Sequence, residues 1–475
     1  MSQSRLSEAK QRLLELQKQG VLPVAASSSA SANKRRKPGE PVWLSFSQEQ
    51  VWRLDQTAAA QAPLHTESIT IHRHGPCDLK TLERSVAEII RRHEIWRTTF
   101  EVISGNPLQV VHPAPTFRLP WTDLRNLPER ERDKAALDLA TQDAKQLFDL
   151  SRGPLMRARL ATLGDTEHRL FLSAHQMLVD GITVFDLFPS ELTTLYESFA
   201  AGRPSPLPEL TAQYADFAYW QRCSLTGAAL EAQLAYWQNE LAGDFPVLQW
   251  PADRARPAAQ TYRGAIRAFQ LPPELTQSLR NLGRQEGATL FMIVLASLMA
   301  LLHKYTSQED IIIGTLAPSG RKRAEFQRLM GYFLSPLPLR AKLTSDLAFR
   351  SLLRQIRKVT LGGISNDDVT LEMIAQRIGL QPDPSRSPLF TVALSVAPDV
   401  PKLPPGWSMT YMDVESGGAR WDLYLELNDR PEGMIGRAQY NPDIFTTAII
   451  SRTVEDLQDL MGRVAADPAR RLSTL

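Results

Sequence analysis

The chain has 475 residues, which is long enough for two to four domains of ordinary size. Hydrophobic residues make up 43% of it and charged residues 22%, as in soluble globular proteins. A formal net charge of +2 is near balance and favours neither nucleic acid nor a membrane surface as a partner, and we expect neither.

The first 25 residues predict an amphipathic helix. Leu6, Ala9, Leu13 and Leu16 recur at helical spacing, with charged residues between them. The stretch 26–40 is small, polar and basic, and it predicts a flexible linker. A tethered helix of this kind suits docking to a partner chain, and a helix folded back on its own globular body fits the pattern equally well.

The cellular compartment can be predicted from the N-terminus, the apolar stretches and the cysteines. The first ten residues lack the apolar core of a secretion signal, and the apolar stretch 288–302 is too short to cross a bilayer. Cys77 and Cys223 form neither a disulfide framework nor a metal-ligand cluster. We therefore expect a cytoplasmic protein with reduced thiols, no metal and no bound cofactor.

A globular part is expected from residue 41, with a first lobe over 41–205. The stretch 78–94 predicts a helix capped by Asp78, and 95–103 predicts a strand. Residues 169–175 predict a short apolar strand ending at His175, and 182–202 predict a helix. The stretch between them is a strand-to-helix turn, a place where functional side chains are often presented.

The second lobe is expected over 206–475, after a proline-rich crossover at 201–210. Residues 287–306 are apolar on nearly every face and predict a buried helix. Residues 310–318 predict a buried strand, and 421–441 predict a hairpin. Helices alternate with strands in both halves without a visible sequence repeat, which predicts two α/β sandwiches that face each other.

The turn at 173–183 reads "SAHQMLVDGIT" and carries His175, Asp180 and Gly181. Histidine and aspartate suit acyl transfer, but a histidine at a strand end is more often structural than catalytic. Gln176 follows directly, and its side chain cannot take up a proton near neutral pH. By itself the turn is a weak indication of catalysis.

Seven motifs in order strengthen it: "LSFSQEQVWRL" (44–54), "RRHEIWRTTF" (91–100), "AHQMLVDGIT" (174–183), "YADFAYW" (214–220), "MGYFLSPLPLR" (330–340), "NDDVTLE" (366–372) and "DPSRSPLF" (383–390). Together they resemble the condensation domain of nonribosomal peptide synthetases, over residues 41–475. The resemblance implies an α/β (α+β sandwich) fold of two chloramphenicol-acetyltransferase-like lobes. These form a V-shaped pseudo-dimer with a central tunnel.

The resemblance also implies the reaction. Upstream and downstream carrier proteins present a donor thioester and an acceptor amine on phosphopantetheine arms, which are substrates and not bound cofactors. The amine attacks the thioester and an amide forms. An adjacent adenylation domain is expected, and the domain itself is expected to be a monomer. The N-terminal helix suggests a donor from another chain, with a non-amino-acid acyl group slightly favoured.

The family signature, His-His-x-x-x-Asp-Gly, falls on His175, Gln176, Asp180 and Gly181, so Gln176 stands where the second, catalytic histidine is usual. The Asp is mainly structural in the family and pairs with an arginine. The resemblance therefore suggests Arg340 and Arg386 as its candidate partners here. It also implies that Arg92 and Arg97 give further support to the site. The tunnel candidates are Ser335, Trp220 and Asp422.

Three interpretations of Gln176 stay open. In the first, the domain is active, because positioning supplies about 7–11 kcal/mol and a general base only about 3–5 kcal/mol. In the second, the domain is catalytically silent and serves as a docking platform for carrier proteins or a tailoring enzyme. In the third, the glutamine is engineered. Heterocyclisation domains fit less well because they carry a different signature. Epimerisation domains fit less well because they need a strong base. His175 is an unfavourable substitute base, since neighbouring strand side chains point to opposite faces.

Overall fold

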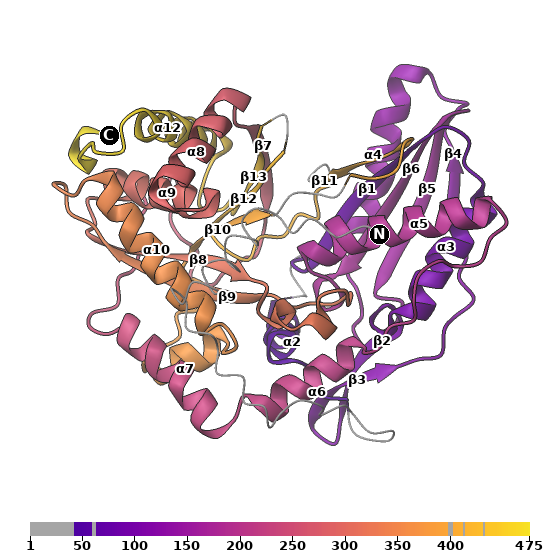
Figure 1. Ribbon diagram of the computed structural model, residues 1–475, viewed down its shortest axis with the longest axis horizontal. Helices are drawn as coiled ribbons and strands as arrows, with labels where there is room; N and C mark the ends of the chain where they lie inside the picture. The colour runs from indigo at the N-terminus through magenta and orange to yellow at the C-terminus, as the bar shows by residue number, and fades with distance from the viewer. Residues whose placement is uncertain (1–41, 59–62, 398–401, 412–413, 431–432) are drawn as a thin grey trace.

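The computed structural model describes residues 42–58, 63–397, 402–411, 414–430 and 433–475. The helix predicted over 1–25 and the linker predicted over 26–40 lie outside the described residues. The described chain forms two lobes that stand side by side, each built on one large sheet with helices against it (Figure 1). The predicted mixed α/β fold of two lobes is confirmed.

The first lobe is built on a five-stranded sheet. In the order β11-β1-β6-β5-β4, its strands are Trp407–Tyr411, Thr66–His74, Glu167–His175, Met156–Gly164 and Trp121–Asp123. Helices α3 (Leu79–Arg92) and α5 (Phe188–Ala200) cover one face, and α4 (Glu129–Lys145) covers the other. Helix α2 (Phe46–Ala58) and the hairpin of β2 (Thr98–Ile103) and β3 (Asn106–Val111) complete the lobe.

Local sequence explains the elements around the signature turn. Asp78 caps α3 by accepting the Thr81 N–H at 2.8 Å, as predicted. The strand expected at 95–103 begins later, because Glu94–Arg97 form a 3₁₀ turn before β2. The helix expected at 182–202 begins as a π-helical turn, Thr183–Leu187, and continues as α5.

The second lobe is built on a six-stranded sheet. In the order β7-β13-β12-β10-β8-β9, its strands are Ala265–Gln270, Ile435–Tyr440, Leu423–Asn428, Val392–Ala397, Asp310–Ala317 and Ser335–Lys342. Four helices pack on its outer face: α8 (Pro273–Glu286), α9 (Leu290–Thr306), α10 (Phe349–Ser365) and α12 (Thr447–Ala466). Helices α7 (Gly227–Glu240) and α11 (Leu371–Arg377) cover part of the inner face. The predicted buried helix is α9, and the predicted hairpin is β12–β13.

One strand crosses from the second half of the chain to the first lobe. Strand β11 pairs with β1, with Tyr411 opposite Ile69 and Trp407 opposite Arg73 (Figure 1). Helix α6 (Tyr214–Ser224) also places Tyr214 and Phe217 in the core of the first lobe. The expected lobe boundary at 205/206 therefore needs correction for these segments. The edge of β1 is completed by hydrogen bonds to a remote strand, which no local pattern indicates.

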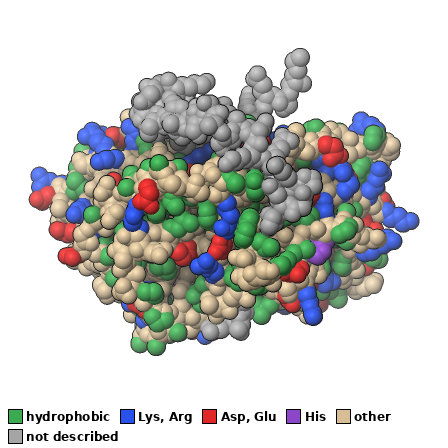
Figure 2. Space-filling model, turned by 90° about the horizontal axis from the view of Figure 1, so that it is seen from below, with side chains coloured by type: hydrophobic (Ala, Val, Ile, Leu, Met, Phe, Trp, Pro, Cys, Tyr) green, Lys and Arg blue, Asp and Glu red, His purple; other side chains and the backbone are tan. Residues whose placement is uncertain are grey.

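The surface agrees with the near-balanced net charge. On the face drawn in Figure 2, side chains of Lys and Arg lie among those of Asp and Glu. Within the described residues no single helix is long and apolar enough to cross a membrane. Helices α8 and α9 pass such a test of length and composition only as a pair, bent by 102°.

Candidate active site

The signature turn is a tight, buried loop between β6 and α5. His175 ends β6 in an extended conformation, with φ −69° and ψ 137°, and Gln176–Leu178 form one 3₁₀ turn (η2). Asp180 then caps the next helical turn, accepting the Thr183 N–H at 2.7 Å and the Thr183 hydroxyl at 2.8 Å. These short-range bonds fix the loop on the first lobe.

Asp180 is held from the other lobe by Arg321. The guanidinium donates from Nε to Oδ2 at 3.0 Å and from Nη2 to Oδ1 at 2.8 Å, and it lies over the Phe333 ring. Both side chains are buried, with 0% of Asp180 and 6% of Arg321 exposed. Arg321 lies in the 3₁₀ turn η4 (Ser319–Lys322), just after β8. The pair therefore joins the loop to the second sheet.

The candidate partners Arg340 and Arg386 are wrong. Arg340 donates to Asp310 at 2.8 and 2.6 Å and also to two backbone carbonyls. Arg386 pairs with Asp383, three residues away. Arg340 lies on β9 beside Asp310 of the neighbouring strand β8, and Arg386 lies on a turn with Asp383, so each is paired with a carboxylate other than Asp180.

Arg92 and Arg97 differ in how they support the fold. Arg92 is buried and donates to Glu191 of α5 at 3.3 Å and to the Pro208 carbonyl at 3.0 Å, so it braces α3 against α5. Arg97 instead pairs with Glu94 at 3.7 Å and donates to the His112 carbonyl. A role of either residue in the site stays a prediction.

His175 lies in a buried hydrogen-bonded cluster with Asp55 of α2 and His65. Its Nε2 lies 3.4 Å from Asp55 Oδ1, and His65 Nδ1 lies 3.3 Å from the same oxygen. Burial alone raises the pKa of Asp55, but the hydrogen bonds from His175 and His65 outweigh it and hold that pKa below its usual range. Burial lowers the pKa of His65 to about 4.

The spacing of these three side chains also suits a metal ion, because their ligand atoms lie within 4.8 Å of one another. The hydrogen bonding favours another state. Met177 donates its N–H to His175 Nδ1 at 3.2 Å, so the neutral ring carries its proton on Nε2, facing Asp55. An Nε2–H cannot bind a metal, and the same bonds leave His175 without a free nitrogen for base catalysis.

Gln176 differs from its neighbours in the loop. Its N–H donates to the His65 carbonyl at 2.7 Å, which fixes its backbone beside β1. Its side chain is partly exposed, whereas His175, Met177 and Asp180 are buried. Of the signature residues, Gln176 and Gly181 are the ones that keep some exposure, so they are the ones within reach of a substrate.

The tunnel candidates lie on different elements. Ser335 is buried at the start of β9 and donates to the Val369 carbonyl at 3.3 Å. Trp220 of α6 packs beside Phe326, with Arg323 over its ring at 5.0 Å. Asp422 is buried before β12 and pairs with Arg256 through both carboxylate oxygens. The tunnel and these lining roles stay predictions.

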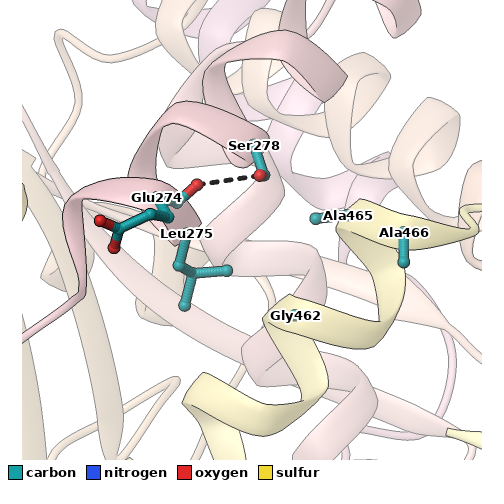
Figure 3. A pocket seen from close by; sticks show the side chains of 6 residues that line it. All are labelled: Glu274, Leu275, Ser278, Gly462, Ala465 and Ala466. Atoms are coloured by element: carbon teal, nitrogen blue, oxygen red, sulfur yellow. Dashed lines mark hydrogen bonds between the residues drawn. The ribbon is translucent and has the colours of Figure 1, made fainter.

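A shallow hollow of about 240 Å³ lies elsewhere, between α8 and α12 (Figure 3). Its lining is small and mostly apolar, and Ser278 donates its hydroxyl hydrogen to the Glu274 carbonyl rather than presenting it to the hollow. The hollow sits on the outer face of the second sheet, away from the signature loop. We assign it no part in the chemistry.

Charged side chains lie between the lobes, close to the loop. Glu67 of β1 faces the second sheet, where Arg437 Nη2 lies 3.8 Å from its Oε2. Arg437 of β13 pairs at 2.8 Å with Glu426, its cross-strand neighbour on β12. Burial raises the pKa of Glu67 to about 7, although Arg437 opposes this effect and Glu426 adds to it. Two carboxylates thus share one guanidinium here.

The comparison with known families now decides the class of the chain. Residues 40–475 match the condensation domain family. The chain belongs to this family. One protein of the linear gramicidin synthase of Brevibacillus parabrevis is 37% identical over 437 residues, 91% of this chain and 6% of that protein. A phosphinothricin tripeptide synthetase of Streptomyces viridochromogenes is 36% identical over 93% of this chain and 41% of its own length. The chain thus spans less than half of the length of these relatives.

Solved structures give the same fold for this condensation domain. The X-domain from teicoplanin biosynthesis is 27% identical with a TM-score of 0.81, covering 93% of this chain and 98% of that one. It has also been solved in complex with OxyB, at a TM-score of 0.79. The first condensation domain of the calcium-dependent antibiotic synthetase, at 22% identity and a TM-score of 0.76, shares the fold over 90% of this chain and 98% of its own.

Sequence reasoning missed several residues of the site in this condensation domain. Arg321 follows the predicted strand 310–318 by three residues, so inspection of the loop after that strand would have suggested it. Asp55 and His65 carry no local signal, because only the packing of α2 against the strand ends brings them to His175. Glu67 is a charged residue among uncharged ones at the start of its strand. A carboxylate in that place is the signal that could have drawn attention to it.

Proposed function

We propose that this condensation domain forms an amide bond between a carrier-bound acyl donor and a carrier-bound aminoacyl acceptor in nonribosomal peptide or hybrid polyketide–peptide biosynthesis. The observation that carries the proposal is the signature loop held between both lobes by the Asp180–Arg321 pair. A loop fixed in this way can receive two substrates from opposite sides. Its relatives are parts of peptide synthetases by name.

The reaction requires little beyond alignment. The acceptor is an α-amine with a reference pKa near 8, so part of it is unprotonated at neutral pH, and the donor thioester is an activated acyl group. Holding the two in one site supplies about 7–11 kcal/mol. The Gln176 amide can donate an N–H to the developing oxyanion or accept an N–H of the amine.

Partners follow from this role. The substrates arrive on the phosphopantetheine arms of an upstream and a downstream carrier protein, and the domain itself binds no cofactor. An adenylation domain next in the polypeptide would load the downstream carrier. The relatives are far longer than this chain, in keeping with such neighbours.

A second function is favoured by two observations. Gln176 replaces the usual catalytic histidine, and the X-domain neighbour forms a complex with OxyB. In this alternative the domain is catalytically silent and holds carrier proteins or a tailoring enzyme. The surfaces for docking would then matter and the signature loop would not.

A carrier-to-carrier assay read by mass spectrometry separates the two. The flanking carrier proteins are loaded with their own substrates, and the native domain is compared with Gln176→Ala and Gln176→His. Amide formation by the native domain, reduced in Gln176→Ala, supports the proposed reaction. Amide formation by Gln176→His alone overturns it and supports the docking function.

A further inference from the structure

Glu67 lies beside the signature loop, on the strand paired with β6. It is opposite Ala174 in the β1–β6 register, and the Gln176 N–H donates to the carbonyl of His65, two residues before Glu67. The backbones of Glu67 and Gln176 are therefore offset by two residues on hydrogen-bonded segments. Diagonal neighbours on paired strands lie about 7–8 Å apart, within reach of long side chains.

The His175 ring is already occupied. Its nitrogens face Asp55 and the Met177 N–H, and the ring packs edge-on against Phe148. The Glu67 side chain is directed at the second lobe, where Arg437 lies. An amine that hydrogen-bonds to the Gln176 amide oxygen therefore has the Glu67 carboxylate within reach, and not the His175 ring.

The contacts of Glu67 are looser than those of a structural ion pair. Glu426 already satisfies Arg437 at 2.8 Å, while Glu67 lies 3.8 Å from it and keeps 30% of its side chain exposed. Among the described residues, the phenols of Tyr332 and Tyr424 also interact with it. Burial raises the pKa of both phenols, so they stay neutral near pH 7.

We infer that Glu67 is the proton acceptor for the attacking amine, a role that the Gln176 side chain cannot fill because it does not take up a proton. This inference rests on the proposed amide-forming function. The amine nitrogen forms a bond to the thioester carbonyl carbon, and its proton passes to the Glu67 carboxylate. The C–S bond then breaks, and the leaving thiolate takes the proton from Glu67. The products are an amide and a free thiol, and the carboxylate is regenerated.

The geometry has an electrostatic consequence that fits this role. A carboxyl whose pKa lies at about 7 exists in both protonation states near neutral pH, which is the condition for efficient proton transfer. The shared guanidinium of Arg437 keeps the site from accumulating two uncompensated negative charges. Glu67 can therefore gain and lose a proton without leaving its place between the lobes.

The test is the pH dependence of single-turnover amide formation between the loaded flanking carriers. Native protein, Glu67→Gln and Glu167→Gln are compared, the last being a matched change at the far end of the same strand pair. The native rate should rise with pH around 7. Glu67→Gln should be about 100-fold slower above pH 7 and lose that rise. Glu167→Gln should behave as native.

A second pair of variants protects the test against a folding defect. Gln176→His supplies another base, so Glu67→Gln should cost less than 10-fold in that background, if the loss is one of proton transfer. A native domain with no turnover at any pH overturns the proposed function and this role together. If the native domain turns over and Glu67→Gln reacts within threefold of its rate, the role of Glu67 alone is overturned. The same holds if Glu67→Gln is slower but keeps the native pH profile and loses the same factor in both backgrounds.

Discussion

Arg321 of the second lobe donates two parallel hydrogen bonds to Asp180 in the loop of the first. A fork of this kind fixes both distance and direction, because the planar guanidinium matches the two carboxylate oxygens. The carboxylate of Asp180 thus serves a structural role, in a hydrogen-bonded ion pair. Its hydrogen bonds to Thr183 and Arg321 leave it facing the protein interior and not a substrate.

Asp180→Ala should reduce the free energy of unfolding by about 3–5 kcal/mol, because it leaves the buried Arg321 charge without a partner. Chemical denaturation followed by circular dichroism measures the loss. The double variant Asp180→Ala/Arg321→Met should recover part of it, since the unpaired charge is removed. Unchanged stability with lost turnover in Asp180→Ala would instead assign the aspartate to the chemistry.

Arg340→Ala should destabilise the protein independently of Asp180. Arg340 is bound to Asp310 and to carbonyls of the segment after α7, with no partner in common with Asp180 among the described residues. The unfolding free energies of Arg340→Ala and Asp180→Ala should therefore add within about 0.5 kcal/mol. A coupling energy well above that value, measured in a double-mutant cycle, would contradict the assignment of Arg321 as the partner.

His65 should make stability depend on pH below 6.5. Burial lowers its pKa to about 4 in the folded protein, from 6.5 for an ordinary histidine, and its Nε2 has no hydrogen-bond partner within the described part of the chain. Between these values the unfolded chain binds the extra proton, so the free energy of unfolding falls as pH falls, by at most about 3 kcal/mol. Below pH 4 this contribution is flat.

The matched variant is His65→Gln, whose amide can still donate to Asp55. The difference in unfolding free energy between native and His65→Gln should shrink or reverse in favour of the variant as pH falls from 6.5 to 4. Urea denaturation at half-unit intervals measures it. A constant difference across this window would mean that His65 is not buried in its neutral form.

Glu67 should act on stability with the opposite sign. Its pKa is raised to about 7 in the folded protein from an ordinary 4.5, so the folded state holds the proton longer and stability falls as pH rises through that window. Glu67→Gln removes this penalty. It should therefore unfold at higher urea than native at pH 8, by on the order of 2 kcal/mol after allowance for partial exposure. Equal stability at pH 8 would contradict a buried ionisation here.

Local patterns predicted the elements that position the loop. The apolar stretch up to His175 and the cap at Asp78 depend on neighbours within a few residues, and so they could be found from sequence. The seven motifs predicted the two-lobed fold through the family resemblance. Gln176 could also be singled out, because the signature defines what should stand beside His175.

The partners of the loop could not be predicted in the same way. Arg321 and Asp180 are 141 residues apart, and Arg340 and Arg386 in the later motifs were equally acceptable by sequence. Only the path of the chain after β8 selects one. Asp55 reaches His175 across 120 residues for the same reason, through the packing of α2 beneath the strand ends.

Strand β11 gives the chain a particular order of folding. His72 on β1 is bonded to Thr410 on β11, across 338 residues of sequence. During synthesis the first sheet must therefore wait with an open edge until most of the second lobe has left the ribosome, and contacts at such separation form slowly. A first half released alone would expose the β1 edge to foreign strands, so an added peptide of residues 402–411 would be its natural complement.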